Sequence, residues 1–132
     1  MAFVVDASIV LSQALGEDSA AADRAMDLAK ATRVFAPALW WYEVRNGLLI
    51  NERRGRLTGR QTMAAMRALS ELAIELDTAP QEPAILTLAR SHRLTVYDAA
   101  YLELALRLRL PLATLDEALA AAARAEGVAA LA

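Results

Sequence analysis

The chain has 132 residues, of which 57% are hydrophobic and 23% charged, and it contains no cysteine. This length and apolar content exclude disorder and suit one domain spanning residues 1–132 with its own core. No apolar run approaches the ~18 residues of a membrane span, and neither a signal peptide nor a thiolate metal site is expected, which together fit a cytoplasmic protein with no membrane partner.

The first half of the chain alternates short apolar strands with helices. Strands are expected at Ala2–Val5 and at residues 34–36, where Pro37 ends the second one. Helices are expected over residues 8–15, 18–31 with Asp18 as the cap, 39–54, and 58–72. The last of these opens with the capping box Thr58-Gly59-Arg60-Gln61.

The second half continues the alternation. Strands are expected at residues 73–76 and 112–115, with a fifth at 128–131, and helices at 81–93, 97–110 and 116–126. Such a pattern indicates an α/β fold in which helices cover both faces of a parallel sheet.

Four acidic residues stand where apolar runs meet segment boundaries: Asp6, Glu43, Asp98 and Asp116. Asp6 and Asp116 follow the first and fourth expected strands, and the carboxyl ends of strands form the ligand crevice of an open α/β sheet. Carboxylates are the ligands that Mg²⁺ and Mn²⁺ prefer, and such ions activate water for phosphodiester cleavage. The pattern therefore predicts a divalent metal site at this edge.

Each of these acids also has a purely local explanation. Asp6 and Asp116 can cap the helices that follow them, and Asp98 can interact favourably with the dipole of its own helix. Glu43 can be a solvated residue paired with a neighbouring arginine. Only the joint occurrence of the four favours a metal site over these roles.

Four segments resemble the PIN-domain ribonucleases, in particular the VapC toxins of VapBC toxin–antitoxin pairs. They lie in the same order and with similar spacing, and they span the whole chain. The matching segments are Val4-Val5-Asp6-Ala7-Ser8, Tyr42-Glu43-Val44-Arg45-Asn46-Gly47-Leu48, Leu94-Thr95-Val96-Tyr97-Asp98-Ala99-Ala100-Tyr101 and Pro111-Leu112-Ala113-Thr114-Leu115-Asp116.

The resemblance implies a three-layer PIN-like fold with about five strands in the order 3-2-1-4-5. It also implies an endoribonuclease that uses Mg²⁺, or Mn²⁺, held by the four acids, with Ser8, Asn46 and Thr114 supporting the site. The implied partners are RNA, an inhibitory VapB-type antitoxin and a second copy of the chain in a homodimer.

Arginines supply 13 of the 14 basic residues, although the net charge is −2. Arg45, Arg53, Arg54 and Arg56 belong to a group near the turn after the helix at residues 39–54, where they can contact RNA phosphates or the antitoxin. The same group can be a solvated turn. Trp40 and Trp41 are expected to divide between core and surface, and Tyr97 and Tyr101 are expected in the core.

Two other classes of function share this fold class. A phosphoacceptor receiver domain needs a lysine at a strand end, whereas Lys30, the only lysine, is expected at a helix end. A haloacid-dehalogenase-type phosphatase needs a second aspartate where this chain has Ser8. A PIN nuclease that processes RNA without an antitoxin, and a non-catalytic interaction module, remain as alternatives.

Overall fold

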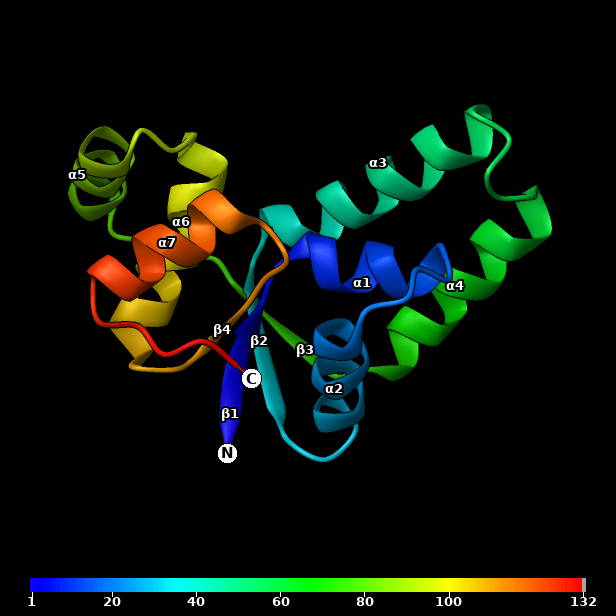
Figure 1. The fold of residues 1–132 in the computed structure, drawn as a ribbon, viewed down its shortest axis with the longest axis horizontal. Coiled ribbons are helices and arrows are strands. Elements are labelled where there is room, and N and C mark those ends of the chain that lie inside the picture. Colours follow the sequence, from blue (N-terminus) through cyan, green and yellow to red (C-terminus); the bar gives the residue numbers. More distant parts are fainter. Residues whose placement is uncertain (132) are drawn as a thin grey trace.

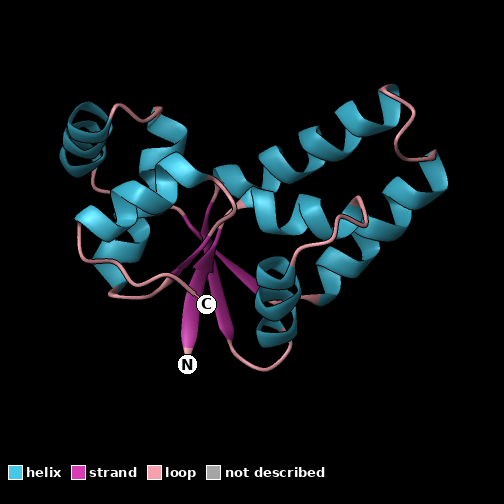
Figure 2. Cartoon of the chain, viewed as in Figure 1, coloured by secondary structure: helices cyan, strands magenta, loops and turns pink. Residues whose placement is uncertain are grey.

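A computed structural model describes residues 1–131 as a layered α/β structure (Figures 1 and 2). The strands are β1 (Ala2–Val5), β2 (Arg33–Pro37), β3 (Ile74–Asp77) and β4 (Leu112–Ala113). The helices are α1 (Ala7–Ala14), α2 (Ala20–Ala29), α3 (Leu39–Arg53), α4 (Gly59–Glu71), α5 (Glu82–His92), α6 (Val96–Leu108) and α7 (Glu117–Ala125).

The four strands form one parallel sheet in the order β3-β2-β1-β4. This confirms the expected α/β fold with its order 3-2-1-4. The expected fifth strand is reduced to a single parallel bridge between Leu112 and Ala130. β4 also ends two residues earlier than expected, because the Thr114 hydroxyl accepts a hydrogen bond from the Asp116 amide and turns the chain out of the sheet.

Helices lie on both sides of the sheet, with α5, α6 and α7 on one side and α1 to α4 on the other (Figure 1). Helix α6 is the central element, since it packs on β1, β2 and β4 and is buried from Ala99 to Ala105. On the other side α3 packs closely on α1. A Cβ at Gly47 of α3 would lie 2.6 Å from a methyl group of Leu11, so the glycine permits this approach.

Side-chain caps fix where the helices begin. The capping box at Thr58 and Gln61 opens α4 as expected. The expectation that Asp18 caps the second helix is wrong, because the Ser19 hydroxyl accepts the amide of Ala22 and α2 starts one residue later. Within residues 1–131, no helix is both long enough and apolar enough to cross a membrane.

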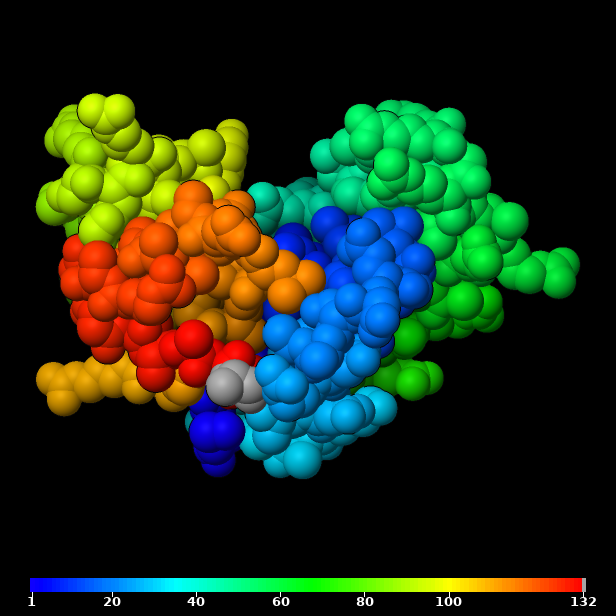
Figure 3. All heavy atoms as spheres, in the orientation of Figure 1, coloured from blue at the N-terminus to red at the C-terminus, as the bar shows by residue number. Residues whose placement is uncertain are grey.

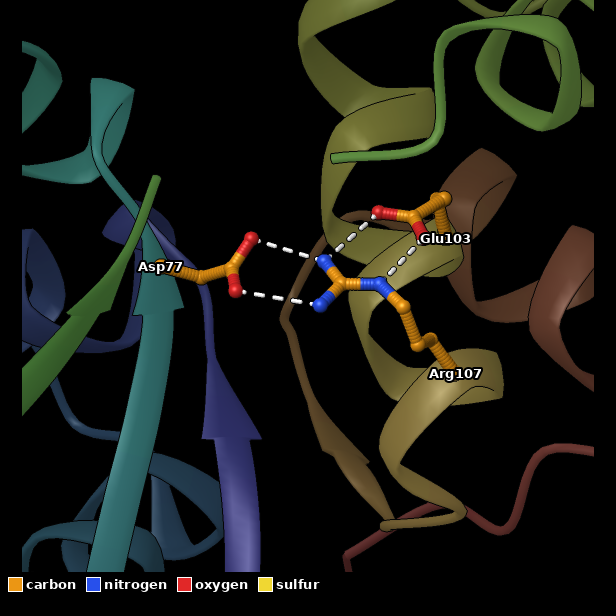
Figure 4. Close-up of polar contacts among 3 residues, drawn as sticks. All are labelled: Asp77, Glu103 and Arg107. Carbon is orange, nitrogen blue, oxygen red and sulfur yellow. Dashed lines mark hydrogen bonds and ion pairs between the residues drawn. The ribbon is translucent and has the colours of Figure 1, made fainter. Parts of the chain in front are cut away.

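An arginine clamp joins α6 to the edge of the sheet (Figure 4). Arg107 of α6 donates to both carboxylate oxygens of Asp77, at the end of β3, over 2.7 and 3.1 Å. It also donates to Glu103, one turn earlier on α6, over 2.7 and 3.0 Å. The hydrogen bonds from Arg107 hold the pKa of Asp77 below its usual range. The clamp thus sets the position of α6 against the edge strand.

We predict that Arg107→Leu destabilises the fold by about 3 kcal/mol, because it leaves Glu103, only 3% exposed, without its counter-charge. Urea denaturation at pH 7 measures this. Part of this loss of stability comes from the ion pair with Asp77. That part should become smaller as the pH falls below about 4, because protonation of Asp77 removes the ion pair from the wild-type protein as well.

The matched control is Arg33→Leu, which removes the exposed ion pair between Arg33 and Glu75 on neighbouring strands. It should change the free energy of unfolding little, since exposed pairs contribute little. Equal losses in the two variants would show that the clamp has no special role.

Candidate metal centre

Four chain segments meet at the carboxyl edge of the sheet, where α1, α3, α6 and α7 begin. The space-filling view shows a hollow there, between the yellow-to-orange part that holds α5 to α7 and the green part that holds α3 and α4 (Figure 3). Dark-blue and teal atoms from the starts of α1 and α3 form its floor. Each of the four candidate acids belongs to one of these segments.

Asp6 lies deepest, with 6% of its surface exposed. It caps α1, since its Oδ1 accepts the amide of Ser8 over 3.0 Å and also the Ser8 hydroxyl. Its Oδ2 accepts the Thr114 hydroxyl. Burial raises the pKa of Asp6, while these hydrogen bonds act in the opposite direction. The carboxylate is therefore held by two hydroxyls and a backbone amide, and by no basic side chain within residues 1–131.

The two hydroxyls also fix the loop after β4. The Ser8 hydroxyl accepts the amide of Leu115 over 2.9 Å, and the Thr114 hydroxyl accepts the amide of Asp116 over 3.0 Å. Both hydroxyls donate to Asp6 at the same time. This network sets the backbone of Asp116 relative to the carboxylate of Asp6.

Glu43 is half-buried on the second turn of α3, and its Oε1 accepts the hydroxyl of Tyr101 from α6. Burial, and next the charge of Asp98, raise the pKa of Glu43 against the effect of that bond. Burial and the bond to Glu43 raise the pKa of Tyr101, with further contributions from the charges of Asp6 and Asp98. Tyr101 therefore stays protonated, and it ties α3 to α6 among the acids.

Asp98 and Asp116 lie closer to solvent. Asp98 is in the first turn of α6, and burial followed by the charge of Asp116 raises its pKa. Asp116 is exposed, and its Oδ1 caps α7 by accepting the amide of Leu119 over 2.9 Å. The charge of Asp116 thus acts on Asp98, and the charge of Asp98 acts on Glu43, which links these three acids along one edge of the sheet.

The local roles considered from the sequence are thus partly real. Asp6 and Asp116 do cap helices, but capping does not require Asp6 to be buried or its second oxygen to be bonded across the sheet. Glu43 has a tyrosine and no arginine as its hydrogen-bond partner within residues 1–131. Capping therefore explains one oxygen of each aspartate and leaves the convergence of charge unexplained.

The donor set fits a hard divalent cation. Within residues 1–131 no three acidic side chains are drawn together tightly enough to enclose an ion. Mg²⁺ does not require this, because it usually keeps several waters and takes only one or two protein carboxylates together with substrate phosphate. Asp6 is buried and has no basic partner within residues 1–131. A divalent cation would supply the positive charge that compensates a carboxylate in such surroundings.

The remaining candidates are spread more widely. Asn46 is exposed, and its side chain has no hydrogen bond to the acids in the part of the chain that the structure describes. Arg45 lies on the second turn of α3 and not at the turn after it, where Arg53, Arg54 and Arg56 are exposed.

The aromatic residues divide unevenly between core and surface. Trp40 is buried and Trp41 is 43% exposed, as expected. Tyr97 is 63% exposed, so its expected place in the core is wrong. Tyr101 is in the core, yet sequence periodicity gave no sign of its bond to Glu43. The Tyr-Asp-Ala-x-Tyr segment was the only signal that could have found it.

Comparisons with known proteins agree with this geometry. The PIN domain family model matches residues 3–125. The chain is 35% identical over 124 residues to Ribonuclease VapC3 of Pyrobaculum aerophilum, covering 91% of this chain and 93% of that protein. Its structure is similar to the crystal structure of PAE2754 from the same organism, with a TM-score of 0.68, 28% identity, and coverage of 92% of this chain and 87% of that one. The chain therefore belongs to the PIN domain family and resembles its VapC-type members.

Proposed function

We propose that this protein is an endoribonuclease that depends on Mg²⁺ or Mn²⁺ and acts as the toxin of a toxin–antitoxin pair. Its membership of the PIN domain family and its similarity to a protein named as a ribonuclease support nuclease activity. The observation that carries the proposal is Asp6, a buried carboxylate that accepts two hydroxyls and a backbone amide, has no basic partner within residues 1–131, and acts on Tyr101 together with the charges of Glu43 and Asp98.

The proposed roles follow from the contacts. A bound divalent cation would activate water and stabilise the charge that develops on the scissile phosphate. Asp6, Glu43, Asp98 and Asp116 would hold it. Ser8 and Thr114 keep both oxygens of Asp6 in place, and Tyr101 orients Glu43. We keep Asn46 as a candidate for supporting contacts that form with substrate.

The antitoxin is proposed to present an apolar helix. Residues 40–49 of α3 are one candidate surface for it, but Trp40 is buried, which leaves Trp41, Tyr42 and Leu49 as the large hydrophobic side chains exposed there. A second surface suits such a helix better. A hollow of about 970 Å³ lies between α2 and α4, and small and apolar side chains including Met26, Ala65 and Ala68 line it. We propose that the antitoxin helix packs there.

Two alternatives make different predictions. A PIN nuclease for RNA processing would cleave RNA but would not be toxic, and a non-catalytic module would do neither. We also propose the homodimer that the family resemblance implies, and sedimentation velocity would measure it.

The central prediction is that Asp6→Asn lowers the rate of RNA cleavage at least ~10²-fold, because charge stabilisation at a preorganised site is lost. Cleavage of total RNA with Mn²⁺ measures this, and EDTA should abolish the wild-type activity.

The matched control is Asp27→Asn on the exposed face of α2, which should cleave at the wild-type rate. If Asp6→Asn fails to fold, the exposed cap Asp116→Asn provides the same test. Wild-type rates in a folded Asp6→Asn, or activity that persists in EDTA, would exclude the mechanism.

A second prediction uses stability. In EDTA the converging carboxylates repel one another, so Asp98→Asn should melt at a higher temperature than the parent. The parent should then gain about 2.7 kcal/mol from Mn²⁺ at one hundred times its dissociation constant, and the variant much less. Calorimetry with and without Mn²⁺ measures both effects.

The pH dependence has a definite sign. Because the folded-state pKa of Asp98 is raised, its ionisation costs stability as the pH rises from about 4 towards 7. The advantage of Asp98→Asn in EDTA should therefore grow over that range. If Asp98 interacts only with the dipole of its helix, the variant should instead be less stable than the parent in EDTA, by a few tenths to ~1 kcal/mol. The two proteins should then gain equally from Mn²⁺.

The third prediction concerns the partner. Ala68→Asp places a charge in the hollow between α2 and α4, and it should weaken antitoxin binding at least ~10-fold while RNA cleavage stays unchanged. Expression of the parent alone should slow growth, and co-expression of the neighbouring small gene should restore it only when residue 68 is alanine.

Ala121→Asp is the matched control, since Ala121 is an exposed alanine on α7, outside the hollow. Growth should recover with this variant as it does with the parent. Harmless overexpression of a nuclease-active parent would argue against a toxin.

A further inference from the structure

The hydroxyl of Tyr101 lies among the acids of the candidate metal centre. It donates to Oε1 of Glu43, 58 residues away on α3. Burial and this bond raise the pKa of Tyr101, and the charges of Asp6 and Asp98 raise it further. Three of the four candidate acids therefore act on the same hydroxyl.

Packing alone does not require this hydroxyl. Tyr101 is 1% exposed and its ring belongs to the core, where a phenylalanine ring would fill the same space. The hydroxyl adds a polar group that needs an acceptor once it is buried. In this fold the acceptor is a half-buried carboxylate whose pKa is raised by burial and by the charge of Asp98. The hydroxyl therefore bears on the site more directly than on the core.

The bond leaves Glu43 with one oxygen that no protein donor engages. Oε1 accepts the Tyr101 hydroxyl, whereas Oε2 accepts no hydrogen bond in the part of the chain that the structure describes. Asp6 is held in a similar way, since its Oδ1 accepts Ser8 and its Oδ2 accepts Thr114. These bonds fix how each carboxylate is turned, so neither is free to rotate and offer both oxygens to one ion.

The way in which a carboxylate binds distinguishes the common divalent cations. Mg²⁺ requires near-octahedral geometry with oxygens at about 2.0–2.1 Å, and Mn²⁺ also suits octahedral oxygen sites. Ca²⁺ takes roughly six to eight oxygens at about 2.3–2.6 Å in flexible geometry, and it often binds both oxygens of one carboxylate. A carboxylate that offers a single oxygen therefore disfavours Ca²⁺ more than it disfavours Mg²⁺ or Mn²⁺.

We propose that Tyr101 is a positioning residue that acts through Glu43 and makes the centre select Mg²⁺ and Mn²⁺ over Ca²⁺. Its hydroxyl engages Oε1 and leaves Oε2 as the oxygen that Glu43 offers to the cation. Without the hydroxyl, Glu43 can turn both oxygens toward one larger ion. This inference rests on the proposed function and names the residue that sets its metal preference.

Competition between two cations on the full chain provides the test. The paramagnetic resonance signal of free aqueous Mn²⁺ gives the dissociation constant of Mn²⁺, and its displacement by added Ca²⁺ gives that of Ca²⁺. The parent should prefer Mn²⁺. In Tyr101→Phe the affinity for Mn²⁺ should fall roughly 10- to 100-fold, the usual cost of losing a group that orients a metal ligand. The affinity for Ca²⁺ should stay the same or rise, so the preference should narrow by that factor or more.

Tyr97→Phe is the matched control, because it deletes a hydroxyl from the same helix, one turn earlier, where the side chain is 63% exposed. Both dissociation constants should equal those of the parent. If Tyr101→Phe does not fold, Glu43→Asp takes its place. This variant keeps the charge but withdraws the carboxylate from Tyr101 by one methylene, and it should narrow the preference as well.

A purely structural role for the hydroxyl makes a different prediction. Tyr101→Phe would then melt at a lower temperature in EDTA, and it would lose affinity for Mn²⁺ and Ca²⁺ by the same factor. A ratio of the two constants that equals the parent's, in Tyr101→Phe or in the substitute Glu43→Asp, would overturn the inference.

Cleavage of RNA by the parent with Mn²⁺, measured in parallel, separates this inference from the proposed function. Cleavage by the parent together with an unchanged ratio in Tyr101→Phe rejects only the role of Tyr101. A preference for Mn²⁺ that narrows in Tyr101→Phe, without RNA cleavage by the parent, rejects only the ribonuclease. A parent that shows no preference for Mn²⁺ rejects the inference, whether or not it cleaves RNA.

Discussion

The carboxylate of Asp6 is the group on which the rest of the site depends. Water is largely excluded from it, and within residues 1–131 two hydroxyls replace the basic partner that a buried charge usually has. Each hydroxyl has one proton, which it donates to Asp6, so its lone pairs accept the amides of Leu115 and Asp116. The charge of Asp6 therefore determines where the loop after β4 lies. The site and the edge of the sheet are one hydrogen-bonded unit.

Helix α6 is held at two points, near its middle and near its end, by quite different interactions. Near its middle, Tyr101 donates to Glu43 among groups that repel one another when ionised. Near its end, Arg107 forms ion pairs with both Asp77 and Glu103. The repulsion among the acids around the first contact costs stability in the absence of a cation, and the ion pairs of the second contribute stability. The clamp at the far end thus offsets part of the repulsion concentrated at the site.

The sequence predicted features that depend on local chemistry. The capping box at Thr58 and the alternation of strands and helices follow from hydrogen bonding and periodicity within a few residues. Features that depend on distant contacts were missed. Periodicity placed Tyr101 in the core but could not show that its hydroxyl meets Glu43, 58 residues away. Tyr97 shares the pattern of a core residue but faces out, because α6 has only just begun there.

The electrostatics of the site bear on how a protein with a net charge of −2 would bind the RNA proposed as its substrate. Without a cation the acids repel phosphate, so a metal ion and an RNA strand should each strengthen the binding of the other. The acids and their cation would therefore decide together whether a phosphate of the strand can enter the hollow.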